Sequence, residues 1–391
     1  MLRCFTALLC LTVLAGLGFS QAGGNTDPVK PPAVPAQVPE TEKVRDLIKE
    51  GKFAEAEKLG KELIAKTPTD AEAYYQLGRA VYFQNRFNEA LPIFEKVAML
   101  LPKFSGAPKF IGDCHLFLRD YTKAEAAYAK ACELDPENAE LVIDRAVALA
   151  RLGKDKESED QFKKALEMDD ENVRAMFEMA SLHDRQGRSS EAETWLKKAL
   201  ALDNQSAYGW TLYGDLLRKQ KQYFRSEDAY RKALAIEPKR IKTLDGLSKL
   251  YVAQERPADT EDVCLDLVAA DPRNVTFQLR LANAIDDQRR YVESEVLYKK
   301  VVELDPKYGQ AHIDFGVSYW RQDKVKEAEA LFKAGLELEP GNAWAHYTFA
   351  NFLRSVKRLK EAKAAFEQAL KLQPDYPEAQ VRLDIVKREL G

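Results

Sequence analysis

Apolar and polar positions along the chain repeat with a fixed period. Laid out in rows of 34 residues from Gln37 to Tyr376, the chain fills ten rows without insertion or deletion. Apolar residues recur at columns 4, 7, 8 and 11 of most rows, and again at columns 20, 24 and 27. Each set lies on one face of an α-helix, because side chains three or four positions apart share a face. Every row therefore predicts two amphipathic helices joined by a turn.

Residue sizes at these columns predict how the two helices pack. Column 8 is small in most rows, as at Gly78 and Gly214, and column 20 is Ala, Ser or Thr in every row. Column 24 is large in most rows, as at Phe94 and Tyr230. The small side chains let the two backbones approach, and the large one fills the remaining space. A single row cannot bury its apolar faces alone, so neighbouring rows must stack and bury them jointly.

The sequence also indicates where the second helix of each row ends and how the repeat array ends. Prolines such as Pro102 and Pro136 recur near the row ends and stop the second helix, because proline cannot continue the hydrogen-bond ladder. Pro92 and Pro108 instead fall inside predicted helices and are expected to kink or shift them. Residues 377–391 begin an eleventh first helix with a polar outer face. We expect this segment to cap the last apolar surface.

The repeat resembles that of the tetratricopeptide repeat family. The fullest match is residues 207–240, which carry the pattern Trp210, Tyr213, Gly214, Leu217, Tyr230, Ala233 and Pro238. Row 71–104 matches nearly as well, whereas the first row has Gly60 where an aromatic residue is usual. The resemblance implies an all-α fold, a right-handed superhelical α-solenoid of ten helix-turn-helix repeats at 37–376 plus the capping helix at 377–391.

The first 36 residues do not follow the period. An apolar run from Cys4 to Phe19 follows Arg3, and Ser20-Gln21-Ala22 places small residues where a signal peptidase cleaves. This pattern predicts a signal peptide at 1–22, with an uncleaved membrane anchor as the alternative. Residues 23–36 are rich in proline and predict an extended linker. We therefore expect an exported protein, periplasmic or extracellular, with no membrane span after cleavage.

Composition narrows the classes of function. The formal net charge is −3, from 59 basic and 62 acidic residues, whereas nucleic-acid-binding proteins usually carry a basic excess. Three cysteines follow the predicted signal peptide, too few for a disulfide framework, although one Cys114–Cys132 bridge is conceivable. Asn204 and Asn274 begin N-x-[ST] sequons, whose use depends on the host.

Catalytic and metal-binding patterns are weak. His115 and His183 occupy column 11, and His312 and His346 occupy column 4, which are packing columns. His312 and His346 lie on equivalent points of adjacent rows, but helix axes about 8–10 Å apart disfavour joint ligation of one ion. The sequence has no glycine-rich phosphate loop and no G-x-S-x-G or H-E-x-x-H motif. We expect no enzyme activity, no cofactor and no metal.

The remaining candidate is the surface formed by columns 2, 5, 9, 12 and 13, which the family resemblance places on a concave, partner-binding face. Two apolar groups occur there: Ile48, Tyr82, Phe83, Leu116 and Phe117 in the first three rows, and Ile313, Trp344 and Tyr347 in the last two. We expect the first group to form one continuous apolar rim. Trp320 lies at the other end of its helix and is treated as a separate feature. The alternative for both groups is that they only pack against the next hairpin.

Basic residues at the same columns are interrupted by acids, which favours an internally paired surface over a nucleic-acid or anion site. They are Arg151, Arg174, Arg185, Arg218, Lys219, Lys242 and Lys249, interrupted by Asp184, Asp215 and Asp245. The expected function is a non-enzymatic scaffold that binds other proteins or peptides, and the sequence identifies neither the partner nor the oligomeric state. The alternative is an envelope structural protein that binds polysaccharide through its aromatic residues.

Overall fold

The computed structural model describes residues 39–391, which are helical and contain no strand. The predicted signal peptide at 1–22 and linker at 23–36 lie outside the described residues. The chain divides into two compact units, an N-terminal unit that ends at Glu237 and a C-terminal unit from Pro238 to Gly391. No helix within the described part is both long and apolar enough to cross a bilayer.

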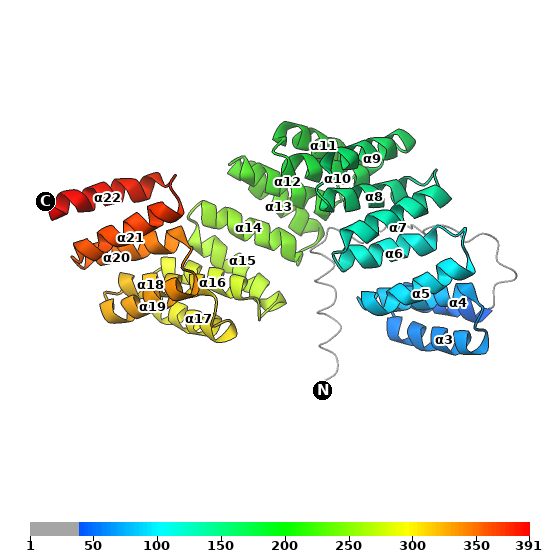
Figure 1. The fold of residues 1–391 in the computed structure, drawn as a ribbon, viewed down its shortest axis with the longest axis horizontal. Helices are drawn as coiled ribbons and strands as arrows, with labels where there is room; N and C mark the ends of the chain where they lie inside the picture. The colour runs from blue at the N-terminus through cyan, green and yellow to red at the C-terminus, as the bar shows by residue number, and fades with distance from the viewer. Residues whose placement is uncertain (1–38) are drawn as a thin grey trace. The chain divides into compact units, whose positions relative to one another are not determined.

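Each unit is a stack of helical hairpins (Figure 1). The N-terminal unit contains α2 (Pro39–Lys49), α3 (Phe53–Lys66), α4 (Ala71–Tyr82), α5 (Phe87–Leu100), α6 (Gly106–Phe117), α7 (Tyr121–Leu134), α8 (Ala139–Arg151), α9 (Asp155–Met168), α10 (Val173–Arg185), α11 (Ser189–Leu202), α12 (Ala207–Lys219) and α13 (Tyr223–Ile236). The C-terminal unit contains α14 (Ile241–Ala253), α15 (Pro257–Ala270), α16 (Val275–Asp287), α17 (Tyr291–Leu304), α18 (Gly309–Arg321), α19 (Val325–Leu338), α20 (Ala343–Ser355), α21 (Leu359–Leu372) and α22 (Pro377–Leu390). Even-numbered helices are the first helices of their hairpins, and α22 is unpaired. The all-α solenoid predicted from the sequence is confirmed.

The turn inside every hairpin has the same backbone geometry. The residue at column 15 has a positive φ in all ten hairpins of the described residues: Gly51, Asn85, Arg119, Gly153, Gly187, Lys221, Glu255, Arg289, Asp323 and Lys357. The next residue then donates its backbone N–H back across the turn, as Arg358 does to the Leu353 carbonyl at 3.0 Å. This left-handed ending satisfies carbonyl groups at the helix terminus and reverses the chain. It fixes where each first helix ends and its partner begins.

The predicted pairing of small and large residues shapes the hairpin cores. A Cβ at Gly214 would lie 2.6 Å from Cε1 of Tyr230, and one at Gly78 would lie 2.7 Å from Cε1 of Phe94. Because such distances are far inside van der Waals contact, only glycine lets the aromatic ring lie this close to the first helix. The hydroxyl of the fully buried Tyr230 then donates to Asp215 Oδ1 at 2.7 Å. The ring therefore fills the core while its hydroxyl reaches the surface of the first helix.

The two internal prolines do not interrupt their helices. α5 continues from Phe87 through Pro92 to Leu100. α6 begins at Gly106, so Pro108 lies in its first turn, where the missing N–H costs no intrahelical bond. Cys114 and Cys132 are both free, so the conceivable bridge between them is absent.

α22 lies on the last hairpin, where the sequence predicts a capping helix (Figure 1). It buries Ala379, Leu383 and Val386, and the last two belong to one core cluster with Phe352 and Phe366. Its other side chains are mostly exposed or half-buried. α22 therefore shields the apolar face of α20 and α21 from water.

Candidate functional site

A groove of about 540 Å³ lies on the first helices of the C-terminal unit, between α18, α20 and α22. We call it the C-terminal groove. Its lining residues are Val317, Trp320, Trp344, Tyr347, Thr348, Asn351, Arg354, Ser355, Lys357, Arg382 and Glu389. A volume of this size falls within the usual range of ligand sites in proteins. The groove is open to solvent.

Three aromatic rings form the apolar part of the C-terminal groove. Trp320 packs edge-on against Phe352, with ring centroids 6.0 Å apart. Tyr347 contacts Phe366 at 5.8 Å and Tyr376 at 5.1 Å between centroids. Trp344 is 40% exposed and contacts no aromatic ring of the described residues. Two rings are therefore held by the core, and the third is presented to solvent.

Three cations and one carboxylate form the charged part of the groove. Arg354 Nε donates to Glu389 Oε2 at 3.1 Å, which ties α20 to α22. This bond raises the pKa of Arg354 and lowers the pKa of Glu389, because each charge favours the other. Neither Lys357 nor Arg382 forms an ion pair with any of the residues 39–391, and both are exposed. The charge of Lys357 also lowers the pKa of Glu389. The groove therefore combines apolar rings with three cations and one carboxylate.

Basic residues at equivalent positions elsewhere in the chain are mostly paired, as the sequence predicts. Arg174 binds both Glu140 and Asp144 at 2.6 Å. Lys219 and Lys249 reach Asp184 and Asp245, each at 2.6 Å. Arg151, at column 13 of α8, forms no ion pair among the described residues either, so the lack of an ion pair is not unique to the C-terminal groove.

The second predicted group is divided by the structure. Trp344 and Tyr347 line the C-terminal groove, but Ile313 is 0% exposed and lies in the core. Its side chain occupies the space beside Gly335, where a Cβ would lie 2.6 Å from Ile313 Cδ1. The prediction that Ile313 lines a surface is therefore wrong. Because Gly335 on α19 has no side chain, the side chain of Ile313 packs into the space beside it. Partner binding by Trp344 and Tyr347 stays a prediction.

The first predicted group does not form a continuous exposed rim. Ile48 and Leu116 are only 6% and 7% exposed and belong to hairpin cores. Tyr82, Phe83 and Phe117 are half-buried. The rim prediction is therefore corrected for Ile48 and Leu116, whose side chains are packed between neighbouring helices.

The three half-buried rings belong to an aromatic cluster with Phe53, Phe87 and Phe110. Tyr82 has ring centroids at 5.4 Å from Phe87, 5.3 Å from Phe110 and 5.9 Å from Phe117. Phe87 stacks on Phe117 at 4.4 Å, and Phe53 stacks on Phe83 at 5.5 Å. Burial raises the pKa of Tyr82 well above its usual value. The cluster joins α3 to α6 and favours packing over partner contact for these residues.

The sequence analysis missed several residues of the C-terminal groove. Trp320 was expected to be separate, yet it lines the same groove as Trp344. Lys357 lies in the turn after α20, outside the five columns considered. Arg382 was assigned only to the polar face of a cap. Its position in the incomplete eleventh row matches column 6 of a first helix, and that register is the signal that could have placed it at the groove.

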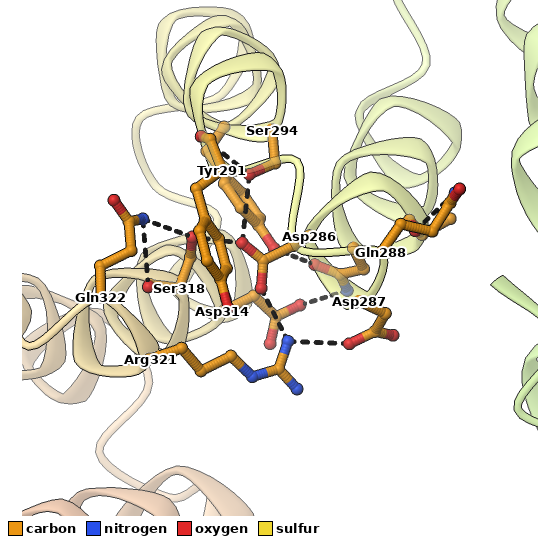
Figure 2. A network of polar contacts seen from close by, with 12 residues as sticks. Asp286, Asp287, Gln288, Tyr291, Ser294, Asp314, Ser318, Arg321 and Gln322 are labelled. Carbon is orange, nitrogen blue, oxygen red and sulfur yellow. Dashed lines mark hydrogen bonds and ion pairs between the residues drawn. The ribbon is translucent and has the colours of Figure 1, made fainter. Parts of the chain in front are cut away.

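A second polar arrangement in the C-terminal unit is a network around the buried Asp286 of α16 (Figure 2). Its carboxylate accepts hydrogen bonds from Ser294 of α17 at 3.1 Å, from Ser318 of α18, and from Arg321 at 2.7 Å. Arg321 also binds Asp287 at 2.8 Å. The buried charge is thus paired and hydrogen-bonded, as stability requires. We interpret this network as a structural link between the hairpin of α16 and α17 and the hairpin that begins with α18.

Asp314 lies beside this network and has different chemistry. It accepts hydrogen bonds from Asn283 at 2.9 Å and from Gln310 at 2.7 Å, but no cation contacts it directly. Burial raises the pKa of Asp314 to about 6. The folded state therefore holds this proton more tightly than the unfolded chain, and the contribution of Asp314 to stability falls as pH rises from about 4 to 6.

The variant Asp314→Asn cannot ionise and should lose this pH dependence. Relative to the variant, the wild type should become less stable by roughly 1–3 kcal/mol between pH 4 and pH 7, which is the scale of a shift of one to two pKa units. Urea unfolding of both chains at the two pH values measures the difference. Asp375→Asn, on an exposed loop, is the control. Its free energy of unfolding should change with pH as that of the wild type does. If the free energy of unfolding of Asp314→Asn changes with pH as that of the wild type does, the raised pKa of Asp314 is contradicted.

Three of the four histidines occupy packing sites, and the fourth, His346, is half-buried. His115, His183 and His312 are each at most 9% exposed. The Nδ1 of His312 lies 3.2 Å from the Tyr308 carbonyl, and the Nε2 of His346 lies 3.0 Å from the Pro340 carbonyl. Across residues 39–391, no group of three or more His, Cys, Asp or Glu residues has metal-binding geometry.

Comparisons with known proteins agree with this fold. Sequence models of the tetratricopeptide repeat match residues 47–116, 156–216, 287–345 and 319–382, others match 111–172 and 246–309, and a third matches 207–240. The Hsp70-Hsp90 organizing protein 1 of Glycine max is 33% identical over 101 residues, covering 26% of this chain and 18% of the relative. The Hsp70-Hsp90 organizing protein of Triticum aestivum is 34% identical over 88 residues, covering 22% and 15%. The chain thus spans less than a fifth of the length of these relatives.

Among solved structures, a tetratricopeptide repeat protein from Parabacteroides merdae has a similar fold. Its TM-score is 0.55 and its sequence identity is 15%, and the match covers 64% of this chain and 98% of the other. At this identity the likeness shows the fold alone.

Proposed function

Because the chain belongs to the tetratricopeptide repeat family, we propose that it is a protein-binding scaffold whose C-terminal groove holds a peptide segment of a partner. The observation that carries the proposal is the groove itself, in which three aromatic rings meet three cations and one carboxylate. The scaffold positions a partner segment and performs no chemistry on it.

The aromatic part of the groove supports a binding role. Aromatic side chains most often dominate protein interfaces, because a large rigid surface is buried at little entropic cost. Trp344 is available for such contact at 40% exposure, and Tyr347 and Trp320 form the adjoining wall. A partner side chain inserted between these rings would displace water from all three.

Replacing Trp344 with Ala tests the proposal. Peptides selected by the wild-type chain from a displayed random library should bind the variant about 1–3 kcal/mol more weakly, the range of substantial interface anchors. Fluorescence anisotropy with the selected peptides measures the affinity. The melting temperature should change little, because the ring of Trp344 contacts no other ring of the described residues.

Phe224→Ala is the matched control, since Phe224 is a surface aromatic residue of the N-terminal unit with 85% exposure. It should bind the selected peptides as the wild type does. Equal affinity of Trp344→Ala and wild type for every selected peptide would contradict the proposal. Wild-type binding on a glycan array that is lost in Trp344→Ala would instead favour a polysaccharide ligand.

A further inference from the structure

We propose that the C-terminal groove binds the proline-rich segment 28–35 of a second copy of this chain, and that the segment binds as a polyproline II helix. The segment precedes the described residues, and it remains on the chain whether or not the predicted signal peptide at 1–22 is cleaved. The inference rests on the proposed function of the groove and names the partner of that site.

The sequence of the segment suits a polyproline II helix. Residues 28–35 read PVKPPAVP, so four of the eight residues are proline, and proline fixes φ near the value of this helix. Because the helix has three residues per turn, side chains three positions apart would share a face. Lys30 and Ala33 would lie on one face. The two other faces would be wholly apolar, with Pro28, Pro31 and Val34 on one and Val29, Pro32 and Pro35 on the other.

The aromatic rings of the C-terminal groove provide a surface for these apolar faces. Trp320 comes from α18, and Trp344 and Tyr347 come from α20, so the rings line the groove from two neighbouring first helices. Contacts with Phe352 at 6.0 Å and with Tyr376 at 5.1 Å between centroids hold Trp320 and Tyr347 in place. Grooves lined by aromatic rings bind proline-rich segments, because the preformed helix loses little conformational entropy on binding.

Open hydrogen-bond donors in the groove match the backbone of such a segment. No described residue accepts a hydrogen bond from the indole N–H of Trp320 or Trp344, whereas the indole N–H of Trp210 donates to the Asn204 carbonyl at 2.9 Å. A polyproline II helix has no internal hydrogen bonds, so its carbonyl oxygens are open acceptors. The two indoles can therefore bind the ligand backbone while their rings contact its prolines.

The position of the segment in the chain favours a second copy as its source. Only residues 36–38 separate it from Pro39, the first residue of α2, and three residues span about 10 Å at most. The groove belongs to the last hairpins of the C-terminal unit, whereas α2 belongs to the N-terminal unit. Binding within one copy would require α2 to meet the groove of the same chain, and a second copy has no such restriction. The contact joins two different surfaces, so it can extend to further copies.

Self-association of two variants of the full chain tests the inference. The groove variant is Trp344→Ala, and the segment variant is Pro31→Ser/Pro32→Ser/Pro35→Ser. Sedimentation velocity over a concentration series should show that the wild type associates reversibly. Each variant should associate at least about 10-fold more weakly, a loss of about 1.4 kcal/mol.

Two control variants are matched to these changes. Lys30→Ala alters only the third face of the segment, and Phe224→Ala removes an exposed aromatic ring outside the groove. Both should associate as the wild type does. Equal weakening by Phe224→Ala would overturn the inference, because association would then depend on exposed aromatic residues in general.

Mixing the two variants gives the most specific result, because the groove variant keeps the segment and the segment variant keeps the groove. Equal amounts should form a complex of two chains that does not grow further, since only the altered groove and the altered segment are then left. The wild type can instead form longer assemblies or close into a ring. A mixture that stays monomeric while the wild type associates would overturn the inference.

The remaining results separate this inference from the proposed function. A wild type that is monomeric at every concentration would overturn the inference, and so would a segment variant that associates as the wild type does. If the monomeric wild type binds library peptides more weakly than the segment variant, the segment occupies the groove of its own copy and the second copy is wrong. Library peptides that depend on Trp344 would in each case leave the proposed function intact, and their absence would overturn both.

Discussion

Deletion of residues 377–391 should destabilise the C-terminal unit and abolish peptide binding together. α22 buries Leu383 and Val386, which are 4% and 0% exposed, against a core that contains Phe352 and Phe366. Burying one such aliphatic side chain contributes about 1.5–3 kcal/mol, so the loss for the two is about 3–6 kcal/mol. The deletion also removes Arg382 and Glu389 from the groove.

Hydrogen exchange measures the structural part of this prediction. Amides of residues 343–376 should exchange faster in the truncated chain, because nearest-neighbour contacts stabilise each hairpin of a solenoid. Residues 71–202, in the N-terminal unit, serve as an internal control and should keep their protection. The substitution Lys387→Ala/Arg388→Ala changes only exposed positions of α22 and should retain both stability and binding. Unchanged protection of 343–376 after the deletion would show that α22 is not a cap.

Replacing Tyr82 with Ala should lower stability and leave peptide affinity unchanged. The ring of Tyr82 contacts Phe87, Phe110 and Phe117 with centroids less than 6 Å away. Truncating a large core aromatic residue typically costs about 3–5 kcal/mol, and we expect about 2–4 kcal/mol here because Tyr82 is only half-buried. The loss should appear as earlier melting of the N-terminal unit.

The variant Tyr82→Phe is the control, since it keeps the ring and no described residue bonds the Tyr82 hydroxyl. It should melt close to the wild type. A thermal melt beside a peptide titration on both variants gives the answer. If Tyr82→Ala instead melts like the wild type and binds a partner more weakly, the aromatic cluster is a binding surface and its interpretation as packing is wrong.

The helical repeat could be predicted from the sequence because it depends on contacts within one row. The match of Gly214 to Tyr230, sixteen positions apart, is readable from residue size alone, and the structure places the ring over the glycine. The same holds for three of the turns after first helices, where Gly51, Gly153 and Gly187 signal a positive φ. The seven other turns adopt that geometry with residues such as Lys357, which the sequence does not signal.

Exposure could not be predicted from column position, because it depends on which side chains neighbouring rows supply. Ile313 and Tyr347 both occupy column 5, yet Ile313 is buried beside Gly335 and Tyr347 lines a groove. Tyr82 and Trp320 both occupy column 12, but the phenylalanines around Tyr82 enclose it. The column assigns a side chain to a face, and the neighbours decide whether it remains accessible.

For the same reason, the sequence identified only part of the candidate site. Trp344 and Tyr347 were identified as exposed aromatic residues on one helix, whereas the groove also needs Trp320, Lys357 and Arg382 from other segments. Arg382 belongs to a helix whose apolar face suggested only capping. The structure shows that α22 both covers the core and contributes charge to the groove, which a pattern of burial alone does not reveal.

The claim that the C-terminal groove binds a peptide segment is tested most directly by photo-crosslinking. A selected peptide with a photoreactive residue at its apolar position is irradiated with the full chain, and the crosslinked residues are identified by mass spectrometry. We predict crosslinks on α18, α20 and α22, at Trp320, Trp344, Tyr347 and their neighbours, that are lost in excess unlabelled peptide. Competed crosslinks confined to second helices or to the N-terminal unit would contradict the account.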